Sequence, residues 1–264
     1  MQAVELIKGS QPMLVSMPHQ GLRLAPGMIE RMTPQALQLP DTDWHLLQLY
    51  DFAAGLGAST LHSPYSRYTI DLNRAPDNTN LYPGQDSTEL CPTSTFSRSP
   101  IYNSGCEPSP TEILQRVELY WSPYHKALRA ELDRLKKQFG TVVLFEAHSI
   151  CSHVPRLFDG RLPDLNIGTN DGKSCGIDLE TVIFSSLQKP NMHSVVINQR
   201  FKGGYITRTY GNPGKGCHAV QLELSQQTYM QESYPFTYIE ERAATIKPVL
   251  QGLLQTTLNW AQSQ

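Results

Sequence analysis

Gly140-Thr-Val-Val-Leu-Phe-Glu-Ala-His-Ser149 is the stretch that indicates the fold class most directly. Residues 141–145 form a short β-branched and apolar run after a helix-ending glycine, which is typical of a buried strand. The end of that predicted strand presents Glu146, His148 and Ser149. Open α/β sheets bind ligands at the carboxyl ends of their strands, so His148 is a candidate site residue.

Elements on the N-terminal side of this strand alternate between strand and helix patterns. Residues 12–17 predict a buried strand that Pro18 ends and that delivers His19 to the sheet edge. Residues 44–56 predict a helix that Asp41 or Asp43 would cap. Residues 109–139 predict two helices in series, divided at Ser122-Pro123.

The same alternation continues towards the C-terminus. We expect helices over residues 178–187 and 238–262 and strands over 194–198 and 219–224, the last carrying Glu223 near its end. Residues 68–70 predict a β-rich segment that leads into Asp71-Leu-Asn-Arg74, and residues 76–110, rich in proline, serine and threonine, predict a long functional loop. The whole chain, 1–264, is therefore expected to be one α/β domain.

Composition excludes several classes of protein. The chain has 264 residues, with 22 lysines and arginines against 24 acidic residues and a net charge of −2, so no strong field would attract nucleic acid or an anionic membrane. No apolar run approaches the roughly 18 residues of a membrane span, and the start lacks a signal-peptide pattern. Five scattered cysteines without a CxxC pair indicate reduced thiols. We expect a soluble, cytoplasmic protein.

Histidines and carboxylates at predicted strand ends suggest metal chemistry. His19, His148 and an acidic residue, with Asp43 at the turn into the first long helix, form the usual ligand set of a catalytic zinc, and Glu223 could act as general base. Spacing alone does not show that these residues converge. A helix N-cap is an equal reading for Asp43, and a solvent-facing strand position would account for Glu223.

Arginines beside turns and strand ends suggest carboxylate binding. Arg67, Arg74, Arg200 and Arg208 occupy such positions, and the planar guanidinium suits two-point contact with a carboxylate. Surface salt bridges would explain them as well. His218 lies close in sequence to Glu223 and is a candidate substrate contact.

Several motifs taken together resemble the N-formylglutamate amidohydrolase (deformylase) family of histidine degradation. The likeness extends over about residues 10 to 232, nearly the whole chain. It rests on Pro18-His19-Gln-Gly21, Asp41-Thr-Asp-Trp-His45, Leu49-Tyr-Asp-Phe52, Ser66-Arg-Tyr68, Asp71-Leu-Asn-Arg74, Leu81-Tyr-Pro-Gly84, Tyr120-Trp-Ser-Pro-Tyr-His125, Ala147-His-Ser-Ile150, Phe201-Lys-Gly-Gly-Tyr-Ile-Thr-Arg208 and Gln221-Leu-Glu223. That family is similar in turn to the zinc carboxypeptidase and aspartoacylase group, which implies a three-layer α/β/α sandwich around a mixed sheet.

The resemblance implies a role for each matching position. His19 and His148 match metal ligands, Glu223 matches the glutamate that activates water, and Arg67 resembles the arginine that polarises the scissile carbonyl. Asn73 and Arg74 resemble a pair that binds a substrate carboxylate.

One departure concerns the acidic metal ligand. The wider group places it three residues after the first histidine, where this chain has Leu22. Asp43 is therefore our choice and Asp41 the second. For the other substrate carboxylate we expect Arg208, with Tyr205 and His218 as further contacts.

The implied activity is metal-dependent hydrolysis of N-formyl-L-glutamate, a small dianion, with Zn²⁺ as the expected metal. The alternatives are a related amidohydrolase acting on another N-acyl amino acid, and an inactive ligand-binding protein with the same fold.

Overall fold

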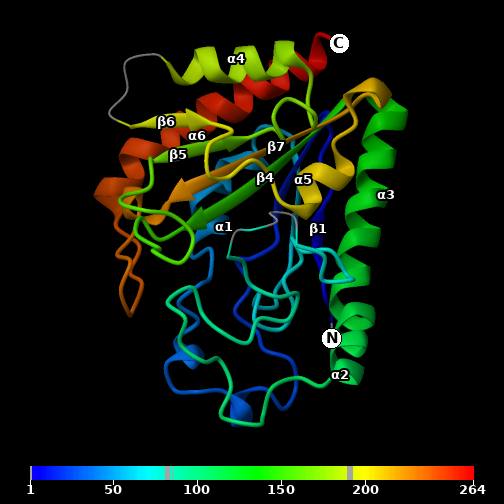
Figure 1. Ribbon diagram of the computed structural model, residues 1–264. Coiled ribbons are helices and arrows are strands. Elements are labelled where there is room, and N and C mark those ends of the chain that lie inside the picture. The colour runs from blue at the N-terminus through cyan, green and yellow to red at the C-terminus, as the bar shows by residue number, and fades with distance from the viewer. Residues whose placement is uncertain (1, 81–83, 85, 189–192) are drawn as a thin grey trace.

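Seven strands form one mixed sheet (Figure 1). The computed structural model describes residues 2–80, 84, 86–188 and 193–264. In spatial order the strands are β1 (Glu5–Ile7), β3 (Ser59–His62), β2 (Met13–Met17), β4 (Val142–Ile150), β7 (Cys217–Ser225), β5 (Leu165–Gly168) and β6 (Val195–Ile197). The central strands β3, β2, β4 and β7 run parallel, whereas β1 is antiparallel to β3 and β5 is antiparallel to β7. The predicted mixed sheet is confirmed.

Helices cover both faces of the sheet. Helices α4 (Ile177–Leu187) and α6 (Glu240–Gln262) pack on one face, where they share a core with alternate residues of β2, β4 and β7. Helices α3 (Ser122–Phe139) and α5 (Tyr205–Tyr210) contribute to a second core on the other face. The result is the α/β/α sandwich that the family resemblance implies.

Alternation along β4 and β7 decides which side chains meet. Phe145 and Ala147 of β4 join the core under α4 and α6, so Glu146 and His148 point to the face that carries α3 and α5. The parallel register pairs Glu146 with Gln221 and His148 with Glu223. All four polar side chains therefore lie on one face, near the carboxyl ends of the two central strands.

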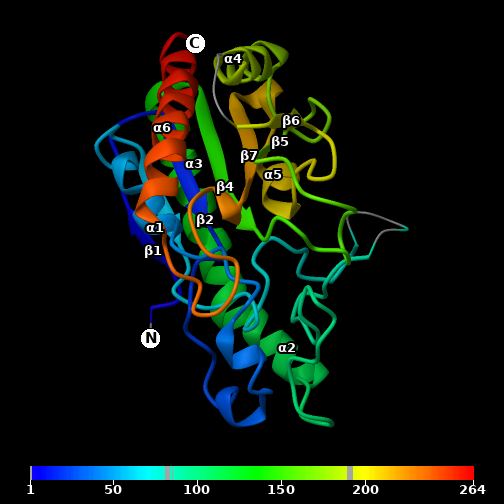
Figure 2. The same cartoon turned by 90° about the vertical axis from the view of Figure 1, so that its left-hand side faces the viewer.

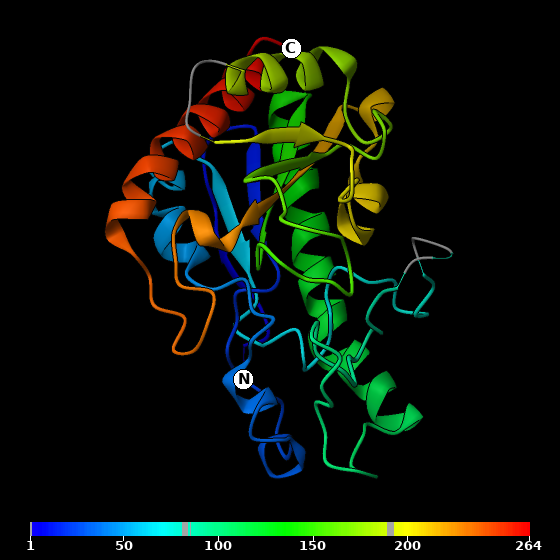
Figure 3. The same cartoon turned by 60° about the vertical axis from the view of Figure 1, so that its left-hand side comes forward.

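Loops at that end of the sheet come from distant parts of the chain (Figures 2 and 3). The connection from β2 to β3 contains the short helices η1 (Ile29–Arg31), η2 (Ala36–Gln38), α1 (Leu46–Leu49) and η3 (Asp51–Ala53). A bridge between Met32 and Tyr102 ties it to the segment before helix α2 (Pro110–Arg116). Residues 81–83 and 85 of the predicted long loop lie outside the described part of the chain. Elsewhere in residues 76–109 the structure describes no helix or named strand.

Several local expectations are wrong, each for a physical reason. Residues 44–56 form only α1 and η3, and the residue before α1 is His45 in a left-handed conformation, so Asp43 is not a capping residue. Residues 67–69 form a turn, where a β-rich segment was predicted at 68–70. Ser122-Pro123 does not divide the helical region: a π-helical segment, η4 (Val117–Trp121), joins α2 to α3, and the proline falls in the first turn of α3.

Other predicted elements are confirmed with adjusted ends. Strands β2, β4, β6 and β7 and helices α4 and α6 lie where the sequence indicates, but β4 extends to Ile150, so His148 lies within the strand and not after it. Short elements escaped prediction: β1, β3, β5 and α5 are too brief to show a period. All five cysteines are free thiols. Among the described residues, no helix combines the length and the apolar character that a bilayer crossing requires.

Candidate active site

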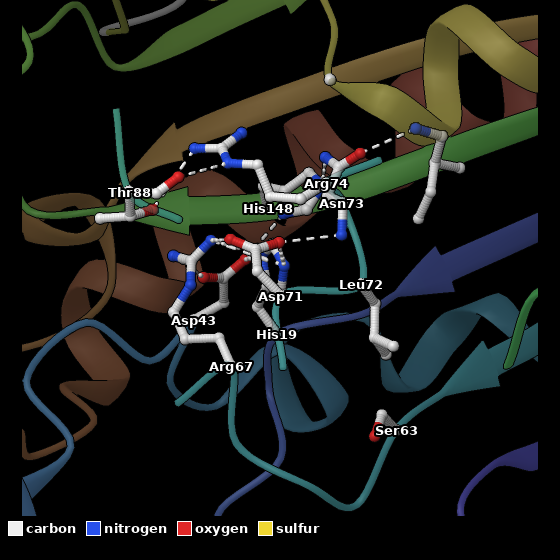
Figure 4. Close-up of polar contacts among 12 residues, drawn as sticks. His19, Asp43, Ser63, Arg67, Asp71, Leu72, Asn73, Arg74, Thr88 and His148 are labelled. Atoms are coloured by element: carbon white, nitrogen blue, oxygen red, sulfur yellow. Dashed lines mark hydrogen bonds and ion pairs between the residues drawn. The ribbon is translucent and has the colours of Figure 1, made fainter. Parts of the chain in front are cut away.

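His19, Asp43 and His148 converge in the interior at the carboxyl end of the sheet (Figure 4). Their potential ligand atoms all lie within 4.8 Å of one another, although 105 residues separate Asp43 from His148. Asp43 Oδ2 lies 3.0 Å from Nδ1 of His148 and 3.8 Å from Nδ1 of His19. The two imidazoles and one carboxylate are a donor set that suits a divalent transition metal. The three side chains are able to hold such an ion.

Backbone contacts fix Asp43 beside both histidines. Its amide donates to the carbonyl of His19 at 3.2 Å, and its carboxylate accepts from the amide of Ser149 at 3.3 Å. Asp41, the second choice for the acidic ligand, has other partners: its carboxylate accepts from the Tyr68 hydroxyl at 2.7 Å and from the amide of Phe96 at 2.9 Å. Asp43, and not Asp41, is therefore the carboxylate that faces both imidazoles.

Polar groups hold the far side of each imidazole. Nε2 of His19 lies 2.7 Å from Asp71 Oδ1, while Nε2 of His148 lies 3.1 Å from the Asn73 amide nitrogen and 3.7 Å from Glu146 Oε1. Such outer contacts orient metal-binding histidines so that the opposite nitrogen faces the ion. Here Nδ1 of His148 faces Asp43 at 3.0 Å, whereas Nδ1 of His19 lies 3.8 Å from Asp43 Oδ2 and 2.9 Å from Nη2 of Arg67.

Burial and neighbouring charges push the pKa values of the two histidines apart. Burial, followed by the Arg67 charge, lowers the pKa of His19 to about 4 and keeps this imidazole neutral. Burial also opposes the charged form of His148, but Asp43 and Glu146 outweigh it and raise its pKa to about 10. A metal ion bound by His148 would therefore compete with a proton that these carboxylates favour.

Glu223 lies next to the metal-ligand group because of the β4–β7 register. It is paired with His148 across the two strands and lines the same pocket. Burial raises its pKa to about 8, against the lowering effect of His148. A carboxyl group that exchanges its proton near neutral pH has the properties of a general acid–base catalyst.

Arg67 forms one wall of the site. Its Nη2 lies 2.9 Å from Nδ1 of His19 and 3.2 Å from Asp71 Oδ2, and its guanidinium stacks 4.9 Å from the centre of the Phe96 ring. Within the described part of the chain its buried Nε has no hydrogen-bond partner. The guanidinium is thus held rigidly beside the metal-ligand group with a donor to spare.

The pocket around these residues has one cationic and one apolar part. Arg74 and Arg200 line it together with Arg67, and the apolar lining comes from Phe96, Ile150, Leu157 and Phe201. Arg74 donates from Nε to the carbonyl of Thr88 at 3.1 Å, and Arg200 donates from Nε to the carbonyl of Leu157. The predicted long loop reaches the site, since Asp86, Ser87 and Phe96 line the pocket.

Three residues predicted to bind substrate do not line this pocket. Arg208 lies on α5 and donates to the carbonyl of Gly203 at 2.8 Å, and Tyr205 begins that helix with its ring 5.7 Å from the Trp121 ring. His218 lies five residues before Glu223 on β7, roughly 17 Å away along an extended strand. Its Nδ1 accepts from the amide of Gly176 at 3.0 Å. Nearness in sequence does not become nearness in space along an extended strand.

Asp71, Glu146 and Gln221 were not predicted as site residues from the sequence. Asp71 is the first residue of the Asp71-Leu-Asn-Arg74 motif. Its position two residues before Asn73, itself predicted to bind substrate, was a signal that could have identified Asp71 as a site residue. In a strand, residues two positions apart point to the same face, so Glu146 shares a face with His148 and Gln221 shares one with Glu223. Arg200 was grouped with the other arginines, but the choice between it and Arg208 needed the tertiary structure.

Comparisons with known proteins identify the family of this chain. A family model described as N-formylglutamate amidohydrolase matches residues 11–230. An N-formylglutamate deformylase of Pseudomonas putida is 50% identical over 96% of this chain and 94% of its own length. One of Pseudomonas aeruginosa is 47% identical over 97% of this chain and 96% of its own length.

Solved structures share the fold over the full chain. The crystal structure of N-formylglutamate amidohydrolase from Ralstonia eutropha JMP134 has a TM-score of 0.83 at 23% identity and covers 100% of this chain and 98% of its own. A gene product of Agrobacterium tumefaciens has a TM-score of 0.73 at 18% identity, covering 98% and 96%. These two likenesses concern the fold alone. The family match and the two deformylase relatives place this chain among amide-hydrolysing enzymes: it belongs to the N-formylglutamate amidohydrolase family.

Proposed function

We propose that this chain hydrolyses N-formyl-L-glutamate to formate and L-glutamate, the last step of a histidine degradation route. One observation carries the proposal. A single pocket is lined by the group of His19, Asp43 and His148, by Glu223, and by the arginines Arg67, Arg74 and Arg200. The names of the two deformylase relatives, each about half identical over nearly the whole chain, support the same substrate.

The metal in this proposal is Zn²⁺, which the side chains of His19, His148 and Asp43 would hold. Two imidazoles and one carboxylate are a common protein ligand set for catalytic zinc. When bound, the ion supplies Lewis-acid polarisation of the formyl carbonyl and lowers the pKa of water. Asp71, Asn73 and Glu146 keep the two imidazoles in the required orientation.

Glu223 moves the proton in this scheme. Its carboxylate takes a proton from water as the water oxygen forms a bond to the formyl carbon, and it then passes the proton to the glutamate nitrogen as the carbon–nitrogen bond breaks. The products are formate and the free amine of glutamate. Its pKa of about 8, raised by burial, suits both halves of the transfer near neutral pH.

Arg67 stabilises the oxygen of the formyl group as negative charge develops on it. The guanidinium is fixed by Asp71 and by the Phe96 ring, so little reorganisation is needed when the charge appears.

Arg74 and Arg200 bind the two carboxylates of the substrate. Both line the pocket that contains Glu223, whereas Arg208 does not line it, so Arg200 replaces Arg208 in the scheme. Three arginines around one pocket suit a dianion, because each carboxylate gains a charge-assisted partner.

Formate release tests the proposal. Purified protein of measured metal content is incubated with N-formyl-L-glutamate, and His148→Ala is compared with His153→Ala, a change at an exposed histidine outside the pocket. We expect His148→Ala to lose both bound metal and activity, and His153→Ala to retain both. Full activity in His148→Ala or in metal-stripped protein would overturn the scheme.

Substrate choice is tested with a panel of N-formyl-L-glutamate, N-formyl-L-aspartate and N-acetyl-L-aspartate. We expect the highest kcat/KM with the first compound. A higher value for either of the others would assign the chain to another N-acyl amino acid, and binding without product release would identify a ligand-binding protein.

A further inference from the structure

Helices α3 and α5, which are labelled in Figure 1, line a second pocket that lies outside the active site. Its volume is about 510 Å³, within the usual range for small-molecule sites. We call it the aromatic pocket, and the lining residues that matter here are Trp121, His125, Lys126, Arg129, Tyr205 and Tyr210. None of them lines the active-site pocket.

Aromatic rings form the walls of the aromatic pocket. Trp121 stacks on His125 with ring centres 3.7 Å apart, and Tyr205 lies 5.7 Å from Trp121. The Tyr210 ring stacks on the His125 ring with centres 5.8 Å apart, and the Tyr210 hydroxyl lies 2.9 Å from Nδ1 of His125. Burial lowers the pKa of His125 to about 4, so the imidazole in this wall is uncharged at neutral pH. Walls of this kind favour a flat ring that can stack or pack edge to face.

The charged residues of the pocket favour an anion. Lys126 and Arg129 are both exposed, and the Arg129 guanidinium lies 4.4 Å from the centre of the Tyr210 ring. Asp133 is the one acidic residue of the lining that the structure describes, which leaves a net charge of one positive unit. A single carboxylate on the ligand would match that charge.

The walls of the aromatic pocket also hold the segment that carries active-site residues. Trp121 Nε1 donates to the carbonyl of Arg74 at 3.0 Å, and His125 Nε2 lies 2.9 Å from the carbonyl of Leu72. At the start of α5, the amide of Ile206 donates to Asn73 Oδ1 at 2.8 Å. Residues 72–74 therefore have the aromatic pocket on one side and the active site on the other.

We propose that the aromatic pocket is a regulatory site for a planar aromatic monocarboxylate, and that its occupancy alters substrate affinity through residues 72–74. The ring of the ligand packs against Trp121 and Tyr205, and its carboxylate pairs with Arg129 and Lys126. Movement of either wall displaces the carbonyls of Leu72 and Arg74, and with them the side chains of Asn73 and Arg74. Binding at the pocket is independent of the proposed function, whereas the effect on substrate affinity rests on it.

Calorimetry with nicotinate as the probe tests binding, and nicotinamide serves as its uncharged counterpart. We expect saturable binding of nicotinate at one site, at least tenfold weaker binding of nicotinamide, and about a tenfold rise in Kd for Arg129→Met. Lys137→Ala is the matched control, because it removes one exposed positive charge from the same helix outside the pocket. Arg200→Ala is a second control for binding in the active site.

Two results would overturn the assignment of the site. One is no saturable binding of nicotinate in the millimolar range. The other is binding that Arg200→Ala abolishes and Arg129→Met leaves intact, which would locate nicotinate in the active site.

The coupling is tested by two readouts, one of which needs no turnover. Nicotinate should slow amide hydrogen exchange at residues 72–74 and change KM for N-formyl-L-glutamate about fivefold, and both effects should be absent in Arg129→Met. Binding with no change in exchange or KM would refute the coupling. If the chain releases no formate, the proposed function fails while the binding and exchange results still decide the inference.

Discussion

Replacement of Arg200 by alanine should weaken substrate binding, whereas the same replacement at Arg208 should leave it nearly unchanged. The two arginines are eight residues apart and were equivalent candidates from the sequence, but of the two only Arg200 lines the pocket that contains Glu223. Arg208 donates instead to the carbonyl of Gly203 near the start of α5. The pair therefore offers one chemical change in two different settings.

The expected size of the effect follows from the exposure of Arg200. A hydrogen bond to a charged group contributes about 1.5–3 kcal/mol, and the half-buried setting of Arg200 favours the lower end of this range. About 1.5–2 kcal/mol corresponds to a rise in KM of roughly 10- to 30-fold. For Arg208→Ala we expect a change of about 0.5 kcal/mol or less, or roughly twofold.

Initial rates of formate release measure this difference. Each variant is assayed with N-formyl-L-glutamate and with two analogues in which either the α- or the γ-carboxylate is replaced by an amide. The penalty of Arg200→Ala should vanish for the analogue that lacks its partner carboxylate. An unchanged KM in Arg200→Ala together with a raised KM in Arg208→Ala would refute the assignment.

Three further predictions follow from other contacts. Glu223→Gln should lower kcat by roughly 10²- to 10⁴-fold without loss of bound metal, because the proposed scheme makes Glu223 the base and not a ligand; a loss of metal in elemental analysis would contradict this. Burial lowers the pKa of His125 to about 4 from its ordinary 6.5. The unfolded chain therefore takes up that proton first as pH falls, so stability present above pH 6.5 is lost between pH 6.5 and 4. In denaturant titrations, the free energy of unfolding of His125→Asn should fall by about 3 kcal/mol less than that of the wild type over this pH range. A pH dependence equal to that of the wild type would show that His125 is not the buried, uncharged histidine described above. Gly204→Ala should lower Tm by an amount equivalent to about 1–3 kcal/mol, because an added Cβ would lie 2.4 Å from the side-chain amide nitrogen of Asn73. Gly252→Ala is the control and should stabilise α6 slightly, because a Cβ there meets nothing within 4 Å. Equal changes in Tm for the two variants would contradict this prediction.

Local patterns were sufficient for the elements that bury one clear face. The helical spacing of Leu128, Leu132 and Leu135 predicted the C-terminal part of α3, and the apolar run before Glu146 predicted β4, because these patterns express burial directly. Strands β1, β3 and β5 have only three or four residues each, too few for a period to emerge. The π-helical join to α3 also escaped prediction, since Pro123 reads as a break unless the neighbouring backbone is known.

For the site, the residues alone suggested that His19, His148, Asp43 and Glu223 act together, and the family resemblance assigned their roles. What local sequence could not decide was which Asp faces both imidazoles, because Asp41 and Asp43 differ only in the contacts that the β2–β3 connection imposes.

The sequence by itself determined the α/β class, the ordering of the main elements and the residue types of the candidate ligand set, because periodicity and residue type are local properties. Only the tertiary structure decided that Glu223 lies beside His148, that Arg200 and not Arg208 faces the pocket, and that Asp71 supports His19. Each of these depends on strand register and loop packing, which bring together side chains that are far apart along the chain.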